Sequence, residues 1–349
     1  MKTRRIVVAL ASAATLLAAG ACGSSPKPGE VASVASSASG ATLTVYSGRS
    51  ESLVKPVIEK LEAATGVDVQ VRYGGSSELA AQLLEEGDAT KADLFFSQDA
   101  GALGALGKAG RLEVLDAAVT GKVLPGFSDS QGLWVATSAR ARVVAYNPDL
   151  APEATSMTSI DAILDPKYKG KVGFAPTNAS FHSFVTALRV VKGEDGAKDW
   201  LTKFKANEPR AYDKNGAVLD GVDKAEVAFG LINHYYWYEK VAEAGVDKVK
   251  AKIHFLNADD PGALINVAGV GIVKGTDAKD AAVKAIDYLL SSEGQTYFAD
   301  ETFEYPVIAG VTTKADLPAL SELKGSSVDL NRLDSLDATL KLLEVVGLT

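Results

Sequence analysis

An aromatic run, LINHYYWY at residues 231–238, carries the most distinctive chemistry of the sequence. A strand is expected to end at Ile232, and Asn233 is a suitable N-cap for a helix that follows. Tyr235 and Tyr236 then fall in the first turn, about 100° apart around the helix axis, so they cannot both point into one core. At a helix start both phenol oxygens can converge on a point beyond the helix end, where the helix dipole favours phenolate. Phenolate is a hard, anionic oxygen donor, and it suits a hard, highly charged cation such as Fe(III).

Four short segments with small polar residues are predicted to open helices. They are Tyr46-Ser-Gly-Arg-Ser50, Tyr73-Gly-Gly-Ser-Ser-Glu78, Pro176-Thr-Asn-Ala-Ser180 and Lys214-Asn-Gly216. Ligands of α/β folds sit at strand ends and helix starts, where free backbone N–H groups face them. One such segment alone is explained by ordinary helix capping, but four directed at one cleft, together with Arg49, indicate an oxyanion site. None has the glycine spacing of a P-loop or of a dinucleotide-binding turn.

Strand-like and helix-like segments alternate from Thr42 onward and would position these residues. The first expected elements are a strand over 42–46, a helix after it, a strand over 68–73, a helix over 76–86 and a strand over 92–97. In the first helix, apolar residues recur at helical spacing, Pro56 is placed in the first turn, and Gly66 ends the helix. This βαβαβ order predicts a parallel sheet covered by helices.

The same alternation resumes in the second half of the chain. The expected strands are 172–175, 227–232 and 266–273, and the expected helices are 180–191, 217–224, 235–244, 278–290 and 292–299. No internal repeat and no second linker separates the two halves. Two α/β lobes without a linker predict that the chain crosses between them more than once, with a ligand cleft where they face each other.

The composition is that of a globular, acidic protein of about two domains. The 349 residues are 47% hydrophobic and 23% charged, and removing Lys2, Arg4 and Arg5 with the leader changes the formal net charge from −8 to −11. Nucleic acid and anionic membrane surfaces are therefore not expected partners. A single cysteine, Cys22, excludes an intrachain disulfide and a thiolate metal site, and three histidines argue against a zinc cluster.

The N-terminus resembles a bacterial lipoprotein leader. Residues 1–21 have a basic start, an apolar run and small residues before Cys22, which is typical of a secretory signal. The text Ala19-Gly-Ala-Cys22 resembles a lipobox, although Ala19 stands where leucine is usual. We expect a lipid on Cys22; the alternative is an ordinary cleaved signal that leaves a stray thiol. Residues 23–41, rich in Ser, Gly, Ala and Pro, are expected to tether an extracytoplasmic body to the cell membrane.

Five segments of the expected folded body have sequences similar to those of a known family. They are Thr42-Leu-Thr-Val-Tyr-Ser-Gly-Arg49, Ala92-Asp-Leu-Phe-Phe-Ser97, Asn233-His-Tyr-Tyr-Trp237, Asp260-Pro-Gly-Ala-Leu264 and Glu304-Tyr-Pro306. Over 42–348 the chain resembles the periplasmic ferric-ion-binding proteins, the solute receptors of bacterial iron(III) ABC importers. The resemblance implies a type II periplasmic-binding-protein fold, in which two hinge-connected α/β lobes close over one ferric ion. Lobe 1 would combine residues 42–140 with 268–316, and lobe 2 would combine 141–267 with 317–349.

The resemblance assigns metal ligands residue by residue. Tyr235 and Tyr236 match the family's two phenolate ligands. The histidine and glutamate that complete the sphere in some members are replaced here by Ser50 and Ser77. Tyr73 is a possible third phenolate, or equally a wall of the cleft. Two tyrosines supply only two of the roughly six ligands that Fe(III) takes, so other donors must complete the sphere.

Members that lack the histidine and glutamate hold carbonate or a similar anion against an arginine, and Arg49 matches that role. Other members use a further tyrosine near the second-lobe helix start, where this chain has Phe181. The residues that resemble a synergistic-anion site are Asn178, Ala179, Ser180, Asn215 and Asn233. Carbonate or bicarbonate is favoured, and phosphate could use the same donors.

The three histidines receive no ligand role. His234 stands where the family more often has a polar amide, His182 is expected to serve the anion from a second shell or lie at the surface, and His254 is expected to be structural.

The sequence thus predicts a monomeric, non-catalytic, lipid-tethered receptor that captures Fe(III) with an anion. It would deliver iron to the permease and ATPase subunits of an ABC transporter. The alternative is a receptor of the same fold for an oxyanion or a small organic ligand, with the tyrosines stacking on it; Tyr235 and Tyr238 could also simply pack together. A hydrolase is not expected, because the sequence has neither a Gly-x-Ser-x-Gly elbow nor a histidine in a triad context.

Overall fold

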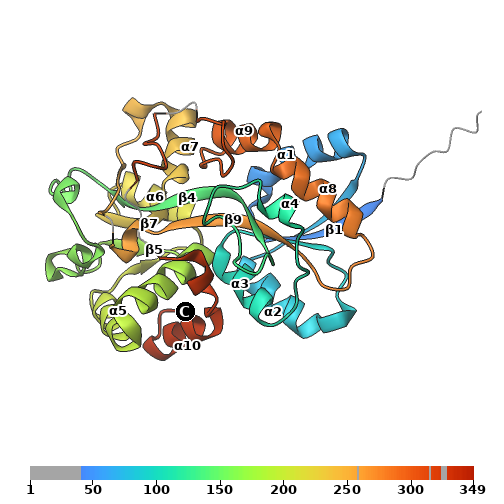
Figure 1. Ribbon diagram of the computed structural model, residues 1–349. Helices are drawn as coiled ribbons and strands as arrows, with labels where there is room; N and C mark the ends of the chain where they lie inside the picture. Colours follow the sequence, from blue (N-terminus) through green and yellow to red (C-terminus); the bar gives the residue numbers. More distant parts are fainter. Residues whose placement is uncertain (1–40, 258, 314–315, 324–327) are drawn as a thin grey trace, which may run out of the picture. The chain divides into compact units, whose positions relative to one another are not determined.

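The computed structural model describes residues 41–257, 259–313, 316–323 and 328–349 (Figure 1). The expected leader, Cys22 and most of the tether lie outside these residues. Within them, nine strands form one mixed sheet in the order β2-β1-β3-β9-β4-β7-β5-β6, with β8 paired to β4. No helix in this described part of the chain is long and apolar enough to cross a bilayer.

Lobe 1 is built on the sheet segment β2-β1-β3. Its strands are β1 (Thr42–Ser47), β2 (Asp68–Tyr73) and β3 (Leu94–Ser97), and its helices are α1 (Glu51–Thr65), α2 (Ser76–Glu86), α3 (Ala100–Lys108), α4 (Ala117–Thr120), α8 (Lys279–Leu289) and α9 (Ser292–Glu301). Strand β1 is parallel to both β2 and β3, which confirms the predicted βαβαβ unit. Gly66 ends α1 in the left-handed conformation as expected, but Pro56 lies inside α1 rather than in its first turn, because the helix begins at Glu51.

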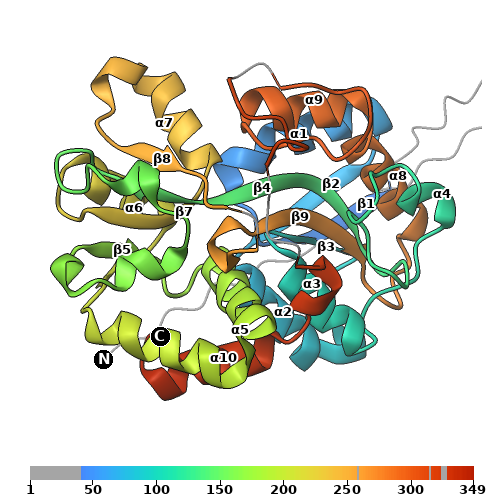
Figure 2. The ribbon, with the colours of Figure 1, turned by 60° about the vertical axis from the view of Figure 1, so that its left-hand side comes forward.

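Two long strands run through the middle of the sheet and join the lobes. Strand β4 (Val135–Tyr146) pairs with β9 (Ile265–Ile272) as far as Ala141, and from Arg142 onward it pairs with β7. Every residue of β4 is buried. Figure 2 shows β4 and β9 passing side by side between the two halves. These strands are the crossings that the sequence predicts.

Lobe 2 is built on β7, β5 and β6 and on the helices around them. Its elements are β5 (Val172–Phe174), α5 (Ala179–Ala206), β6 (Arg210–Ala211), α6 (Asn215–Asp223), β7 (Phe229–Asn233), α7 (Tyr235–Ala244), β8 (Lys252–His254) and α10 (Leu336–Val346). Helix α5 extends past the expected end because a second helix continues it across a break at Gly193, where φ is 73° and ψ is 170°. The C-terminal segment touches both lobes: Leu333 packs into the core of lobe 1, and Leu343 packs into a core of lobe 2.

Candidate functional site

The two tyrosines of the aromatic run lie side by side at the junction of β7 and α7. Their ring centroids are 4.3 Å apart, and Tyr235 is fully buried. The expected N-cap is wrong: Asn233 is still paired with Arg142 in the sheet, so His234 precedes the helix, without a side-chain capping bond. Helix α7 nevertheless begins at Tyr235, as the sequence predicts.

Burial decides the protonation state of both phenols. It raises the pKa of Tyr235 well above its ordinary value, and it also raises that of Tyr236. A hydrogen bond with Tyr235 and, to a smaller extent, Arg49 and Asn215 offset part of the effect on Tyr236. The expected preference of the helix dipole for phenolate is therefore outweighed by desolvation. A cation that binds these oxygens must displace two protons.

Arg49 is bound by the carboxylate of Glu304, a residue to which the sequence analysis assigned no function. It follows Gly48, where a Cβ would lie 1.9 Å from the Oγ of Ser76, so only glycine fits this turn. Arg49 Nη1 and Nη2 donate to the two carboxylate oxygens of Glu304 at 2.9 and 2.5 Å, and both side chains are fully buried. Burial alone would lower the pKa of Arg49 and raise that of Glu304, but each partner keeps the other charged. Only Nε of Arg49 has no hydrogen-bond partner in the described residues.

A second buried arginine, Arg140 on β4, has an entirely unpartnered guanidinium. Its Nε, Nη1 and Nη2 find no acceptor among the described residues. The only hydrogen bond of the Tyr235 hydroxyl within these residues is with the neighbouring phenol of Tyr236. Burial lowers the pKa of Arg140, while the charges of Glu304 and Tyr235 raise it. Two amides that the sequence assigns to the anion site also have polar atoms without a hydrogen-bond partner in the described residues: Nδ2 of Asn233 and Oδ1 of Asn215. Native proteins rarely bury so many unsatisfied polar atoms together, which indicates a place built for a polar ligand.

The turn predicted to bind an anion does assemble beside the tyrosines. The side-chain oxygen of Asn178 accepts from the N–H of Ser180 at 3.0 Å, and Asn215 Nδ2 donates to the Oγ of Ser180 at 3.1 Å. Asn215 also interacts with the phenol of Tyr236. Arg142 donates to the Ser180 carbonyl at 3.2 Å, and burial lowers its pKa to about 9. Ala179 begins α5 within this turn.

The serines and the third tyrosine lie differently. Ser50 precedes α1 and is exposed, without a side-chain capping bond. The Oγ of Ser77 lies 3.0 Å from His182 Nδ1, so this pair links α2 of lobe 1 to α5 of lobe 2. Tyr73 is half-buried at the end of β2. No hydrogen bond joins these three residues to the tyrosine pair within the described chain.

His234 has a structural role in the hinge. Its Nδ1 accepts from the Ala141 N–H at 3.2 Å, and its Nε2 donates to the Phe303 carbonyl at 2.8 Å. The ring also stacks on Tyr305, with centroids 4.8 Å apart. Both ring nitrogens are occupied, so neither is available to a metal.

Replacing His234 with asparagine is expected to reduce the loss of folding stability that occurs as the pH falls from 6.5 to 4. Burial lowers the pKa of His234 in the folded protein to about 4. As the pH falls, the histidine is therefore protonated in the unfolded chain before it is protonated in the folded protein. The wild-type protein should keep this part of its stability above pH 6.5 and lose about 3 kcal/mol of it between pH 6.5 and 4. Urea unfolding of iron-free protein at pH 7.5, 5.5 and 4.5 measures the effect. An equal acid slope in wild type and His234→Asn would contradict it.

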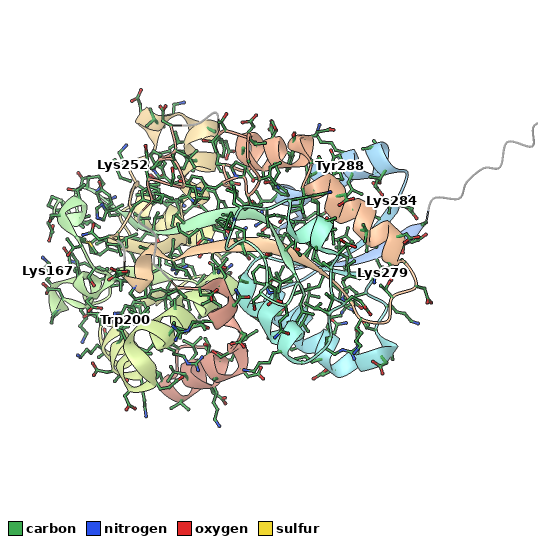
Figure 3. The ribbon with its side chains drawn as sticks, viewed as in Figure 1. Lys167, Trp200, Lys252, Lys279, Lys284 and Tyr288 are labelled. Carbon is green, nitrogen blue, oxygen red and sulfur yellow. The ribbon has the colours of Figure 1, made fainter. Side chains whose placement is uncertain are left out.

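Sequence reasoning missed Arg140 and Glu304 as site residues. Arg140 lies in the middle of a strand, away from the strand ends and helix starts where ligands are sought. The available signal was a pair of arginines in a strand that has no other charged residue, VATSARARVVAY. Three of the four lysines labelled in Figure 3 have no contact with the site: Lys279 and Lys284 lie exposed on α8, and Lys167 pairs with Glu153. The described residues hold no cluster of three or more His, Cys, Asp or Glu side chains that could bind a metal.

Comparisons with known proteins agree with this architecture. The model of a family described as bacterial extracellular solute-binding protein matches residues 89–335. The major ferric iron-binding protein of Neisseria meningitidis is 33% identical, over 88% of this chain and 93% of its own. The Fe(3+)-binding periplasmic protein of Serratia marcescens is 32% identical, over 84% and 87% respectively.

Among solved structures, iron-bound HitA from Pseudomonas aeruginosa matches with a TM-score of 0.81 and 32% identity, covering 88% of this chain and 99% of that one. These proteins are solute-binding proteins of the cell envelope, and the two-lobe type II fold is confirmed. The chain therefore belongs to the bacterial extracellular solute-binding proteins and, among them, to the periplasmic ferric-ion-binding proteins.

Proposed function

We propose that the protein binds Fe(III) through the phenolates of Tyr235 and Tyr236 together with a synergistic anion. The observation that carries this proposal is the tyrosine pair, with Tyr235 fully buried, near the guanidinium of Arg140, which has no hydrogen-bond partner in the described residues. Phenolate oxygens suit Fe(III), and a buried cation with free N–H groups suits an oxyanion. The names of the relatives from Neisseria meningitidis and Serratia marcescens support iron as the cargo.

The anion follows from ligand and charge counting. Two phenolates contribute −2 toward a +3 ion and fill only two of roughly six coordination positions. Carbonate, or phosphate in its place, would supply further oxygens, held by Arg140 and by the donors of the turn and the amides. Those donors are Asn178, Ala179, Ser180, Asn215 and Asn233. Arg49 contributes its charge and its Nε–H, while each of its Nη groups donates one hydrogen bond to Glu304.

In this proposal the protein is a non-catalytic receptor outside the cytoplasmic membrane. A lipid on Cys22 would anchor it, and the tether would let the monomeric body reach the permease of an ABC importer, whose ATPase drives uptake. Two lobes joined by β4 and β9 suit such a carrier, because a hinge can enclose the ion and release it.

The test is a visible-light titration of the purified protein with Fe(III) supplied as its citrate complex. In buffer containing bicarbonate or phosphate, a phenolate-to-iron charge-transfer band should appear and saturate at one iron per chain. In anion-depleted buffer the band should be weaker and the binding looser. A protein that stays colourless while it is saturated with iron would contradict the tyrosine site.

Replacing Arg140 with glutamine is expected to remove the dependence on the added anion. Because Arg140 has no ion-pair partner at hydrogen-bonding distance among the described residues, the change should leave folding intact while iron affinity in bicarbonate falls by at least about tenfold. Competition with citrate at several bicarbonate concentrations measures this. The exposed Arg210, paired with Glu226 at the surface, provides the control variant Arg210→Gln. Wild-type anion dependence in Arg140→Gln would show that the anion binds elsewhere.

A further inference from the structure

A carboxylate lies one helical turn beyond the tyrosine pair, on the face of α7 that carries both phenols. Glu239 follows Tyr235 by four residues and Tyr236 by three. At 100° per residue it lies about 40° around the axis from Tyr235 and about 60° from Tyr236, and so between them. Helical side chains lean toward the N-terminus of their helix, so this carboxylate leans toward the phenols.

Glu239 has no neutralising partner in the described part of the chain. It makes no hydrogen bond or ion pair there, although it is half-buried. The neighbouring Lys240 instead bonds Asp220 and lies near Asp223. The cation that Glu239 does face, Arg49, is already bound by Glu304.

The electrostatic surroundings of Glu239 are mostly acidic. It interacts with Glu304, with the phenol of Tyr236 and with that of Tyr297 on α9. Burial and the charge of Glu304 raise the pKa of Glu239 to about 8. A half-buried carboxylate among acidic groups is unfavourable by itself, and a bound cation would relieve it.

Elimination points to the same side chain. The described residues contain no cluster of three or more His, Cys, Asp or Glu that could hold a metal. Of the two glutamates that interact with the phenols, Glu304 is bound by Arg49 through both oxygens. Glu239 is the one whose oxygens are free of such a bond.

We propose that Glu239 is a protein ligand of the ferric ion, donating a carboxylate oxygen beside the two phenolates. This inference rests on the proposed function. Two phenolates and one carboxylate contribute −3, which neutralises Fe(III) with protein groups alone. One negative charge of the synergistic anion is then balanced by Arg140 rather than by the metal.

The test compares Glu239→Gln with wild type and with Glu243→Gln. Glu243 is an exposed glutamate on the same helix, so its variant has the same change of charge without the proposed contact. Each protein is titrated with Fe(III)-citrate in bicarbonate buffer, and both affinity and the position of the visible band are recorded. Thermal unfolding of the iron-free proteins checks that all three fold alike.

Glu239→Gln should stay coloured but bind iron at least about tenfold more weakly, since losing even an outer partner of a metal site costs that much. Its band should move to longer wavelength, because iron without the carboxylate is a stronger acceptor of phenolate charge. Glu243→Gln should match wild type in both readouts. Equal affinity and an unshifted band in Glu239→Gln would overturn the inference and leave the tyrosine site standing. A colourless, iron-saturated wild type would overturn both.

Discussion

Replacing either Tyr235 or Tyr236 with phenylalanine is expected to abolish tight iron binding while leaving the fold intact. Phenylalanine keeps the ring that packs in the pair and removes only the oxygen donor. Since the Tyr235 hydroxyl interacts only with the Tyr236 phenol among the described residues, its removal should destabilise the iron-free protein little. Affinity for Fe(III) should fall by more than about a hundredfold, because a direct ligand is lost rather than an outer partner. Competition against citrate, followed in the visible band, measures the loss.

Tyr238 offers the matched control for this experiment. It lies on the same helix, and its hydroxyl donates to the Asp316 carbonyl at 3.2 Å, away from the pair. Tyr238→Phe should bind iron as wild type does. If both Tyr235→Phe and Tyr236→Phe retained wild-type affinity, the metal site would have to be placed elsewhere.

Replacing Arg49 with glutamine is expected to destabilise the protein by about 3–5 kcal/mol, because it leaves the buried carboxylate of Glu304 without its cation. Urea unfolding of the iron-free protein measures this loss. A double variant, Arg49→Gln with Glu304→Gln, removes both charges and should recover most of the stability.

The double variant also separates folding from iron binding. If it is stable but binds iron weakly, Arg49 acts on the metal site through its charge; if it binds iron normally, the pair only holds the hinge region together. A single Arg49→Gln variant as stable as wild type would contradict the importance of the ion pair.

Local patterns predicted the elements that carry the site. The sequence predicts helix α7 at its observed bounds, with Tyr235 directly after a short apolar strand. The pairing of Tyr235 with Tyr236 and the turn at Asn178 were also visible, since each depends on residues close in sequence. The N-cap is predicted wrongly: Asn233 stays in the sheet because Arg142, far away along the chain, pairs with it.

Contacts between distant residues could not be predicted in this way. Arg49 and Glu304 are 255 positions apart, and only the folded chain shows that they neutralise each other. The raised pKa of Tyr235 could not be predicted for the same reason. The helix dipole is a local property, but the burial that outweighs it comes from contacts with residues distant in sequence. The sequence does not single out Arg140, because its distinguishing feature is a buried guanidinium without a hydrogen-bond partner among the described residues, and only the folded structure shows this.

Resonance Raman spectroscopy of the iron-loaded protein, excited within its visible band, tests the central claim most directly. Vibrations of iron-bound phenolate should be enhanced in wild type and absent from the double variant Tyr235→Phe with Tyr236→Phe. An iron-saturated wild-type protein without phenolate vibrations would contradict the tyrosine-ligated ferric site.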